Sequence, residues 1–114
     1  TGFLIRACIR CGGILSQATP RQLNSLSRFG AHIGLAFQII DDILDITGDE
    51  KELGKDVGSD LEKDKATYPA LYGLEASRCK ADELVKDSIA CLEEFDNRAD
   101  PLREIARFFV QRTF

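Results

Sequence analysis

Apolar residues recur at helical spacing along most of the chain, and turn-forming residues divide it into segments. The first segment, from residue 1 to about 15, is apolar apart from Arg6 and Arg10. We expect it to form a helix that Gly12-Gly13 breaks near its end, because glycine is a poor helix former.

A second, much longer helix is predicted from about residue 21 to 46. It follows Thr19-Pro20, where proline suits the first helical turn. Its end is expected at Thr47-Gly48, because glycine commonly follows the last turn of a helix.

A charged loop is predicted from 47 to about 59. After it the sequence predicts four helices separated by polar turns. They are a short helix opened by Ser59 with Glu62, a helix starting at Thr67-Tyr68-Pro69 and ending near Gly73, an amphipathic helix from 75 to about 95, and a last helix starting at Asp100-Pro101. The last helix is predicted to bury Leu102, Ile105, Ala106, Phe108 and Phe109. Strand-like alternation, repeats and low-complexity tracts are missing, so the sequence predicts an all-α unit spanning residues 1–114.

Composition narrows the function classes. The 114 residues carry a net charge of −4 and show no basic patch with interleaved aromatics, which disfavours a nucleic-acid partner. No apolar run approaches the ~20 residues that a membrane span needs, and the N-terminus lacks a signal-peptide layout. The four cysteines do not have the spacing of a zinc site and are expected to be reduced, buried or interfacial thiols; they are Cys8, Cys11, Cys79 and Cys91.

One polar stripe interrupts the long helix. Gln38, Asp41, Asp42 and Asp45 fall within an arc of about 100° at helical spacing, whereas nearly all other positions from 37 to 46 are apolar. A helix that is apolar almost all round is a buried helix, so the stripe is expected to face an internal cavity.

Small residues lie in line with this stripe, towards the start of the helix; they are Asn24, Ser27, Ala31 and Gly34. They leave room for a long slender ligand, or alternatively allow close helix packing through Gly30 and Gly34. His32 lies on the opposite side of the helix and is interpreted as structural.

The stripe is unfavourable for bare carboxylates. Asp41 and Asp45 are a like-charge pair four residues apart, near the negative end of the helix dipole. A bound cation reverses both effects. Oxygen ligands without His or Cys favour Mg²⁺ or Ca²⁺ over zinc, and Mg²⁺ is usually held by a few carboxylates together with substrate phosphates. An EF-hand loop starting at Asp45 is excluded, because Glu50 stands where that loop needs glycine.

Groups suited to phosphate follow downstream, in Gly54-Lys55-Asp56-Val57-Gly58-Ser59-Asp60 and Asp64-Lys65-Ala66-Thr67-Tyr68-Pro69. Glycine lets the backbone approach a ligand closely, and lysine is a point-charge phosphate binder. The succession FQxxDDxxD, GKxxGSD and KxTYP resembles the second aspartate-rich region of the trans-isoprenyl diphosphate synthases, the farnesyl and geranylgeranyl diphosphate synthases and their relatives.

The resemblance implies a fold and an activity. The fold is the isoprenoid synthase helical bundle. In this family, two aspartate-rich motifs hold three Mg²⁺ ions on an allylic diphosphate. When the diphosphate leaves, isopentenyl diphosphate attacks the resulting allylic cation and a proton is lost. The products expected here are farnesyl or geranylgeranyl diphosphate.

It also implies roles for single residues. Asp41 is expected to be the main metal ligand, supported by Asp42, Asp45 and Asp60. Lys55 and Lys65 are expected to bind diphosphate oxygens, although either could be an ordinary surface lysine. Gln38 is expected to line the path of the allylic cation. Thr1-Gly2 matches the end of a Lys-Thr-Gly motif that contacts the allylic substrate; alternatively, Thr1 only caps the first helix.

The first aspartate-rich motif is absent, so the chain resembles the C-terminal part of such an enzyme and is expected to be inactive and prone to self-association by itself. The resemblance further implies a homodimer in the full-length enzyme, in the cytoplasm or, in a plant, the plastid. The alternative is a non-catalytic subunit that pairs with an active synthase.

Overall fold

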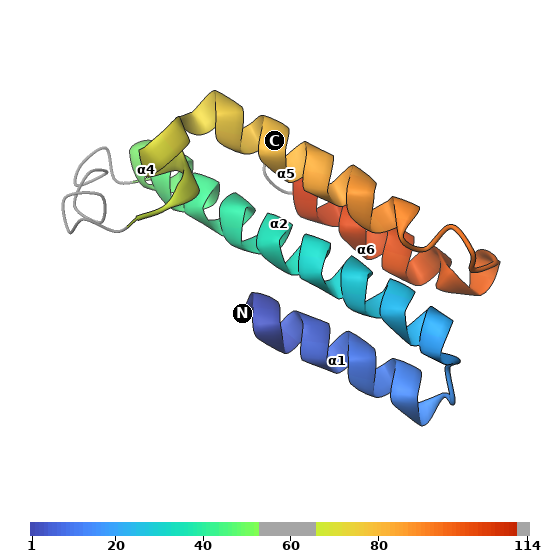
Figure 1. Cartoon of the computed structure of the whole chain (residues 1–114). Coiled ribbons are helices and arrows are strands. Elements are labelled where there is room, and N and C mark those ends of the chain that lie inside the picture. Colours follow the sequence, from blue (N-terminus) through green and yellow to red (C-terminus); the bar gives the residue numbers. More distant parts are fainter. Residues whose placement is uncertain (53–65, 112–114) are drawn as a thin grey trace.

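The computed structural model describes residues 1–52 and 66–111, except for the side chains of 49–52. Every regular element in these two stretches is helical, as predicted (Figure 1). The elements are α1 (Gly2–Leu15), α2 (Pro20–Glu52), α4 (Tyr68–Tyr72), α5 (Leu74–Ala90), a single 3₁₀ turn at Asn97–Ala99, and α6 (Asp100–Gln111).

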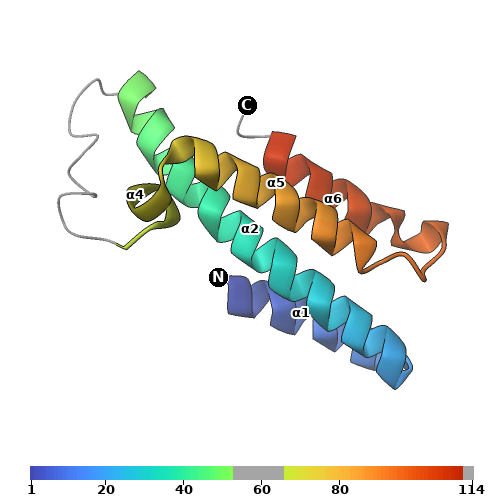
Figure 2. The ribbon, with the colours of Figure 1, turned by 45° about the horizontal axis from the view of Figure 1, so that its top comes forward.

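Helix α2 is the central element. In both views α1 runs back along its first half on one side, and α5 and α6 lie on the other side (Figures 1 and 2). The turn between α1 and α2 ends in a capping box. The backbone N–H of Gln22 donates to Thr19 Oγ1 at 3.1 Å, and the backbone N–H of Thr19 donates to Gln22 Oε1 at 2.9 Å. This exchange satisfies two backbone donors at the α2 start that proline alone leaves open.

The hydrophobic core lies between α2, α5 and α6. Its fully buried side chains on α2 include Phe29, Ile33, Ile40 and Ile43. The side chains that meet them from the other elements are Ala81, Leu84, Val85, Leu92 and Ala106. The positions recur at three and four residues along α2, so one face of that helix is buried against its neighbours.

The predicted end of the long helix is wrong, and the predicted break in the first helix is absent. Helix α1 ends at Leu15 as expected but runs through Gly12-Gly13 without interruption, and α2 continues through Thr47-Gly48 to Glu52. Glycine lowers helix stability by only about 1 kcal/mol, which packing of the neighbouring turns can offset. At the second position, Thr47 Oγ1 also donates to the Ile43 carbonyl one turn back at 3.1 Å.

The C-terminal helices start close to the predicted residues but differ in detail. Thr67 caps α4, accepting from the Ala70 N–H at 3.1 Å, and α4 ends before Gly73 as expected. Helix α5 ends at Ala90 instead of residue 95, and Asp96 caps the 3₁₀ turn that precedes α6. The short helix expected at Ser59 lies outside the described residues.

Burial on α6 was predicted only in part. Ala106 is buried and Leu102 and Phe109 pack against the core, whereas Ile105 and Phe108 are 49% and 58% exposed. The cysteines were predicted to be buried or interfacial, and three of them are not buried. Cys8, Cys11 and Cys79 are exposed and Cys91 is half-buried, so an interfacial position stays a prediction.

The outer side of α1 is apolar and open. Its exposed large side chains are Phe3, Leu4, Ile14 and Leu15. None of the helices within 1–52 and 66–111 has the length and hydropathy that a bilayer crossing requires.

Candidate functional site

The polar stripe lies on α2 opposite the core. Gln38 and Asp45 are exposed, and Asp41 and Asp42 are half-buried, while Ile39, Ile40 and Ile43 behind them are buried. Gln38 Nε2 donates to Asp42 Oδ1 at 3.4 Å, which ties the amide to the carboxylates one turn along. The four side chains therefore share one helix, as predicted, and the core fixes the orientation of that helix.

The N-terminus of α1 lies beside the stripe. A Cβ atom added at Gly34 would lie 2.8 Å from the Gly2 Cα atom, so the first turn of α1 rests directly on α2 one turn before Gln38. Thr1 stands at the cap position, and its side chain makes no capping hydrogen bond. The backbone N–H groups of this turn and the positive end of the α1 dipole thus lie close to Gln38, where they favour an anion.

The sequence left open whether the small residues of α2 provide room for a ligand or allow close helix packing. A Cβ at Gly30 would lie 2.9 Å from the Arg6 Cα, and Gly34 is equally close to Gly2, so both glycines serve close packing of α1 on α2. Room nevertheless remains next to them. A hollow of about 380 Å³ is lined by Gly2, Phe3, Arg6, Ala31, Gly34, Leu35 and Gln38. Close packing and a hollow beside the stripe are therefore both present.

An aromatic pair links the stripe to α6. The Phe37 and Phe109 rings meet edge to face, with centroids 5.2 Å apart at 60°. Phe37 immediately precedes Gln38, so α6 supports the helix at the point where the stripe begins. The sequence gave no sign of this contact, because contacts between residues so far apart leave no local pattern.

The other predicted site residues, Lys55, Asp60 and Lys65, lie outside the described residues. Within the described part of the chain, no three His, Cys, Asp or Glu side chains come together closely enough to hold a metal ion. The donors on α2 are all oxygens, which suits Mg²⁺, but they are too few for an all-protein site.

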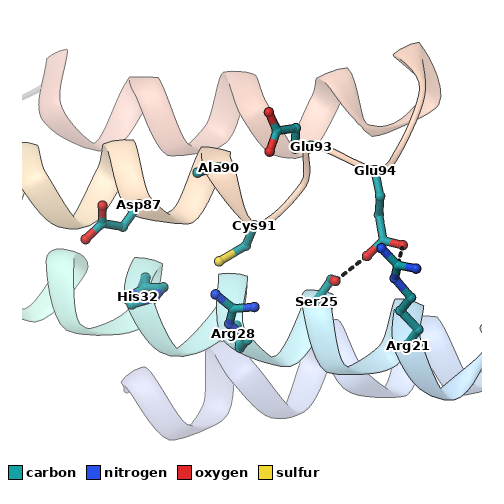
Figure 3. Close-up of a pocket in the computed structure, with 9 residues that line it drawn as sticks. All are labelled: Arg21, Ser25, Arg28, His32, Asp87, Ala90, Cys91, Glu93 and Glu94. Atoms are coloured by element: carbon teal, nitrogen blue, oxygen red, sulfur yellow. Dashed lines mark hydrogen bonds and ion pairs between the residues drawn. The ribbon is translucent and has the colours of Figure 1, made fainter.

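A second hollow, of about 560 Å³, lies on the other side of α2 against the end of α5 (Figure 3). Arg21 pairs there with Glu94, which also accepts a hydrogen bond from Ser25. Burial raises the pKa of the Cys91 thiol, with the Arg28 charge opposing and Asp87 adding to the shift. A thiol with a raised pKa is a poor nucleophile at neutral pH.

His32 lines this second hollow and not the stripe, in agreement with its predicted position on the opposite side of α2. Three carboxylates share the hollow with the basic side chains; they are Asp87, Glu93 and Glu94. Because these carboxylates lie among Arg21, Arg28 and His32, the hollow lacks the unbalanced negative charge that would attract a cation. The stripe on α2 is therefore the better candidate for a site that holds a metal ion and a diphosphate.

Comparison with a solved structure identifies the fold. The chain superimposes on a crystal structure of an FPP/GFPP synthase from Zymomonas mobilis with a TM-score of 0.76 and 37% identity, covering 96% of this chain and 34% of that one. The described helices therefore have the all-α isoprenoid synthase fold.

The sequence comparisons give the family. Residues 1–105 match the polyprenyl synthetase family. The chain is 46% identical over 112 residues to a geranylgeranyl diphosphate synthase of Cyanophora paradoxa, and 44% identical over 116 residues to a farnesyl diphosphate synthase of Haemophilus influenzae. These alignments cover 98% of this chain in both cases, and 37% and 38% of the two relatives. The chain belongs to the polyprenyl synthetase family and spans somewhat more than a third of the length of these relatives.

Proposed function

We propose that the protein carrying this chain is a Mg²⁺-dependent short-chain trans-prenyltransferase. It condenses isopentenyl diphosphate with an allylic prenyl diphosphate, giving farnesyl or geranylgeranyl diphosphate. The observation that carries the proposal is the position of Gln38, which donates to Asp42 of the stripe, lies one turn from the contact of Gly34 with the N-terminus of α1, and lines the adjoining hollow. The names of its relatives support the same substrates.

The carboxylates supply the metal ligands in this proposal. Asp41 is the main ligand, with Asp42, Asp45 and Asp60 in support, and the opposing carboxylates come from parts of the protein beyond these 114 residues. Three Mg²⁺ ions are expected in the complete site; held by these carboxylates, Mg²⁺ would supply Lewis-acid stabilisation of the charge on the leaving diphosphate. Half-burial of Asp41 and Asp42 strengthens their interaction with a cation, because solvent screens it less.

The other groups bind and orient the substrate. Lys55 and Lys65 hold diphosphate oxygens, and the first turn of α1 with Thr1 offers backbone donors to the same anion. Gln38 lines the hollow, where its amide dipole would face the allylic carbon chain. Its long hydrogen bond to Asp42 favours that orientation.

The chain alone is expected to be inactive, because charge on the leaving diphosphate must be neutralised from two sides by pre-positioned groups. These residues provide one side.

We expect the full-length protein to act as a homodimer, in the cytoplasm or in a plastid. The competing function, a non-catalytic partner of an active synthase, does not need an intact stripe.

The decisive assay follows labelled isopentenyl diphosphate into an allylic primer, with and without Mg²⁺, using the full-length protein. Asp41→Ala should lower kcat about a hundredfold or more, since several kcal/mol of charge stabilisation are lost. Asp42→Ala should cost much less. Asp82→Ala, at an exposed position on α5, is the matched control and should leave turnover unchanged.

Two results would count against the proposal. Equal, small losses in Asp41→Ala and Asp42→Ala would remove the assignment of Asp41. No turnover from a folded full-length protein would favour the non-catalytic partner instead. Calorimetry adds a separate check, because Mg²⁺ should bind weakly alone and more tightly with diphosphate.

A further inference from the structure

Phe37 stands beside the carboxylate that the stripe offers as its main metal ligand. Phe37 and Asp41 are four residues apart on α2, and residues at this spacing are neighbours on the surface of a helix. Helical side chains lean towards the N-terminal end of their helix, so the Asp41 carboxylate leans towards the turn that carries Phe37. Both side chains are half-buried. The Phe37 ring therefore limits, on one side, the space open to the Asp41 carboxylate.

The position of the Phe37 ring is set by α6. The Phe109 ring meets it edge to face, with centroids 5.2 Å apart at 60°, an arrangement that aromatic pairs prefer. Phe109 is itself held by its helix, because Ala106 is fully buried and Leu102 packs against the same core. These three positions share one face of α6, and α6 packs on both α2 and α5. The core thus reaches the stripe through two rings from distant parts of the chain.

A carboxylate that binds Mg²⁺ needs such support. Mg²⁺ demands near-ideal octahedral geometry, so a carboxylate binds it well only in a narrow range of orientations. The buried isoleucines behind the stripe fix the helix, but they do not restrict the side chain of Asp41 on its open side. Without the Phe109 ring, the Phe37 ring would lose the surface on which it rests. Asp41 would then gain orientations that do not suit the metal, and water would screen its charge more strongly.

We propose that Phe109 is a positioning residue of the metal site, which acts through the Phe37 ring on the Asp41 carboxylate. This inference rests on the proposed function, because it takes Asp41 to be a Mg²⁺ ligand. Phe109 touches neither metal nor substrate in this arrangement. It narrows the orientations of a ligand on another helix, and a residue of α6 thereby tunes the metal affinity of α2.

The test uses the full-length protein and varies the Mg²⁺ concentration. Phe109→Leu keeps an apolar side chain but removes the ring. It should raise the Mg²⁺ concentration for half-maximal turnover about tenfold, the scale on which groups that orient metal ligands act. The KM for isopentenyl diphosphate, measured at saturating Mg²⁺, should stay unchanged. Phe109→Tyr keeps the ring and should restore the original Mg²⁺ dependence. Calorimetry of Mg²⁺ binding in the presence of inorganic diphosphate should show the same shift and the same rescue without turnover.

Phe95→Leu is the matched control. It makes the same substitution at another half-buried phenylalanine of the core, in a hollow beside Leu26, roughly three turns of α2 before Gln38. It should lower stability to a similar extent and leave the Mg²⁺ dependence unchanged, which separates positioning from a general loss of packing. If Phe109→Leu does not fold, Phe109→Met fills the same space with a flexible side chain and takes its place.

A double-mutant cycle tests the route through Phe37. Phe37→Leu should weaken Mg²⁺ binding by a similar factor as Phe109→Leu. Combining the two should weaken it little further, because the ring on which Phe109 acts is then already gone. Full additivity of the two shifts would contradict the route and with it the inference.

The outcomes separate the two proposals. An unmodified, folded full-length protein that shows no Mg²⁺-dependent condensation contradicts the proposed function. An active protein whose Mg²⁺ dependence is unchanged by Phe109→Leu, shifts equally in Phe95→Leu, or is not rescued by Phe109→Tyr overturns this inference while leaving the proposed function intact.

Discussion

The two sides of α2 are packed in different ways. Towards α5 and α6 the helix presents Phe29, Ile33, Ile40 and Ile43, whose side chains fill the space between the helices. Towards α1 it presents Gly30 and Gly34, where an added Cβ atom would lie only 2.8–2.9 Å from a Cα atom of α1. The first side is a hydrophobic core, and the second is a close contact between backbones.

This difference has a functional consequence. A side-chain core tolerates some change of volume because neighbouring side chains can move, whereas an atom added at a backbone contact can be accommodated only if a whole helix shifts. The glycine side fixes where α1 begins, and therefore where its N-terminus and the hollow lie relative to Gln38. The site depends on the side of α2 that contributes less apolar burial.

Ile40→Ala should have the largest effect on stability. Ile40 is fully buried, and removing its side chain leaves a cavity in the core, so the free energy of unfolding should fall by about 2–5 kcal/mol. Ile105→Ala, at a half-exposed position on α6, is the control and should change it by much less. Urea unfolding of the full-length proteins measures both; equal losses would show that the α2–α5 side is not the main core.

Gly34→Ala tests the other side. The added methyl would lie 2.8 Å from the Gly2 Cα, so α1 must shift, at a cost of about 1–3 kcal/mol. Gly12→Ala is the matched control, because a Cβ there meets nothing within 4 Å. It should stabilise the protein by about 0.5–1 kcal/mol through the higher helix propensity of alanine. Stability changes of the same sign in the two variants would contradict the close contact.

Arg103→Met tests how α6 is held on the core side. The Arg103 guanidinium donates to the carbonyl oxygens of Leu92, Phe95 and Asp96 at 2.8–3.0 Å, which satisfies acceptors after the end of α5. Its loss should lower the unfolding free energy by about 1–3 kcal/mol.

Arg107→Met is its control, since within the described part of the chain Arg107 forms an exposed pair with Glu104, and such pairs contribute about 1 kcal/mol or less. A comparable loss in both variants would mean that the carbonyl contacts of Arg103 contribute nothing particular.

The smallest expected effect is that of Thr19→Ala, at the turn that joins α1 to α2. Loss of the capping box should cost about 1 kcal/mol. A double-mutant cycle with Gln22→Ala gives the coupling free energy between the two side chains. The double mutant should lose less stability than the sum of the two single losses, because each side chain caps the backbone of the other residue. Strict additivity of the two losses would argue against the reciprocal hydrogen bonds.

The sequence by itself determined the all-α class and the stripe. Both follow from local periodicity, since the spacing of Gln38, Asp41, Asp42 and Asp45 places them on one side of any helix that contains them. The starts at Pro20 and Tyr68 were also predictable, because capping residues act within one turn.

Only the tertiary structure decided where α2 and α5 end and what surrounds the stripe. Helix α2 runs past Gly48 to Glu52, and Ile105 and Phe108 stay exposed although their spacing suits a core. The contacts of Gly34 with Gly2 and of Phe37 with Phe109 join residues far apart in the chain. Such contacts leave no periodic signal, because they depend on how the helices are placed and not on the order of residues within any one of them.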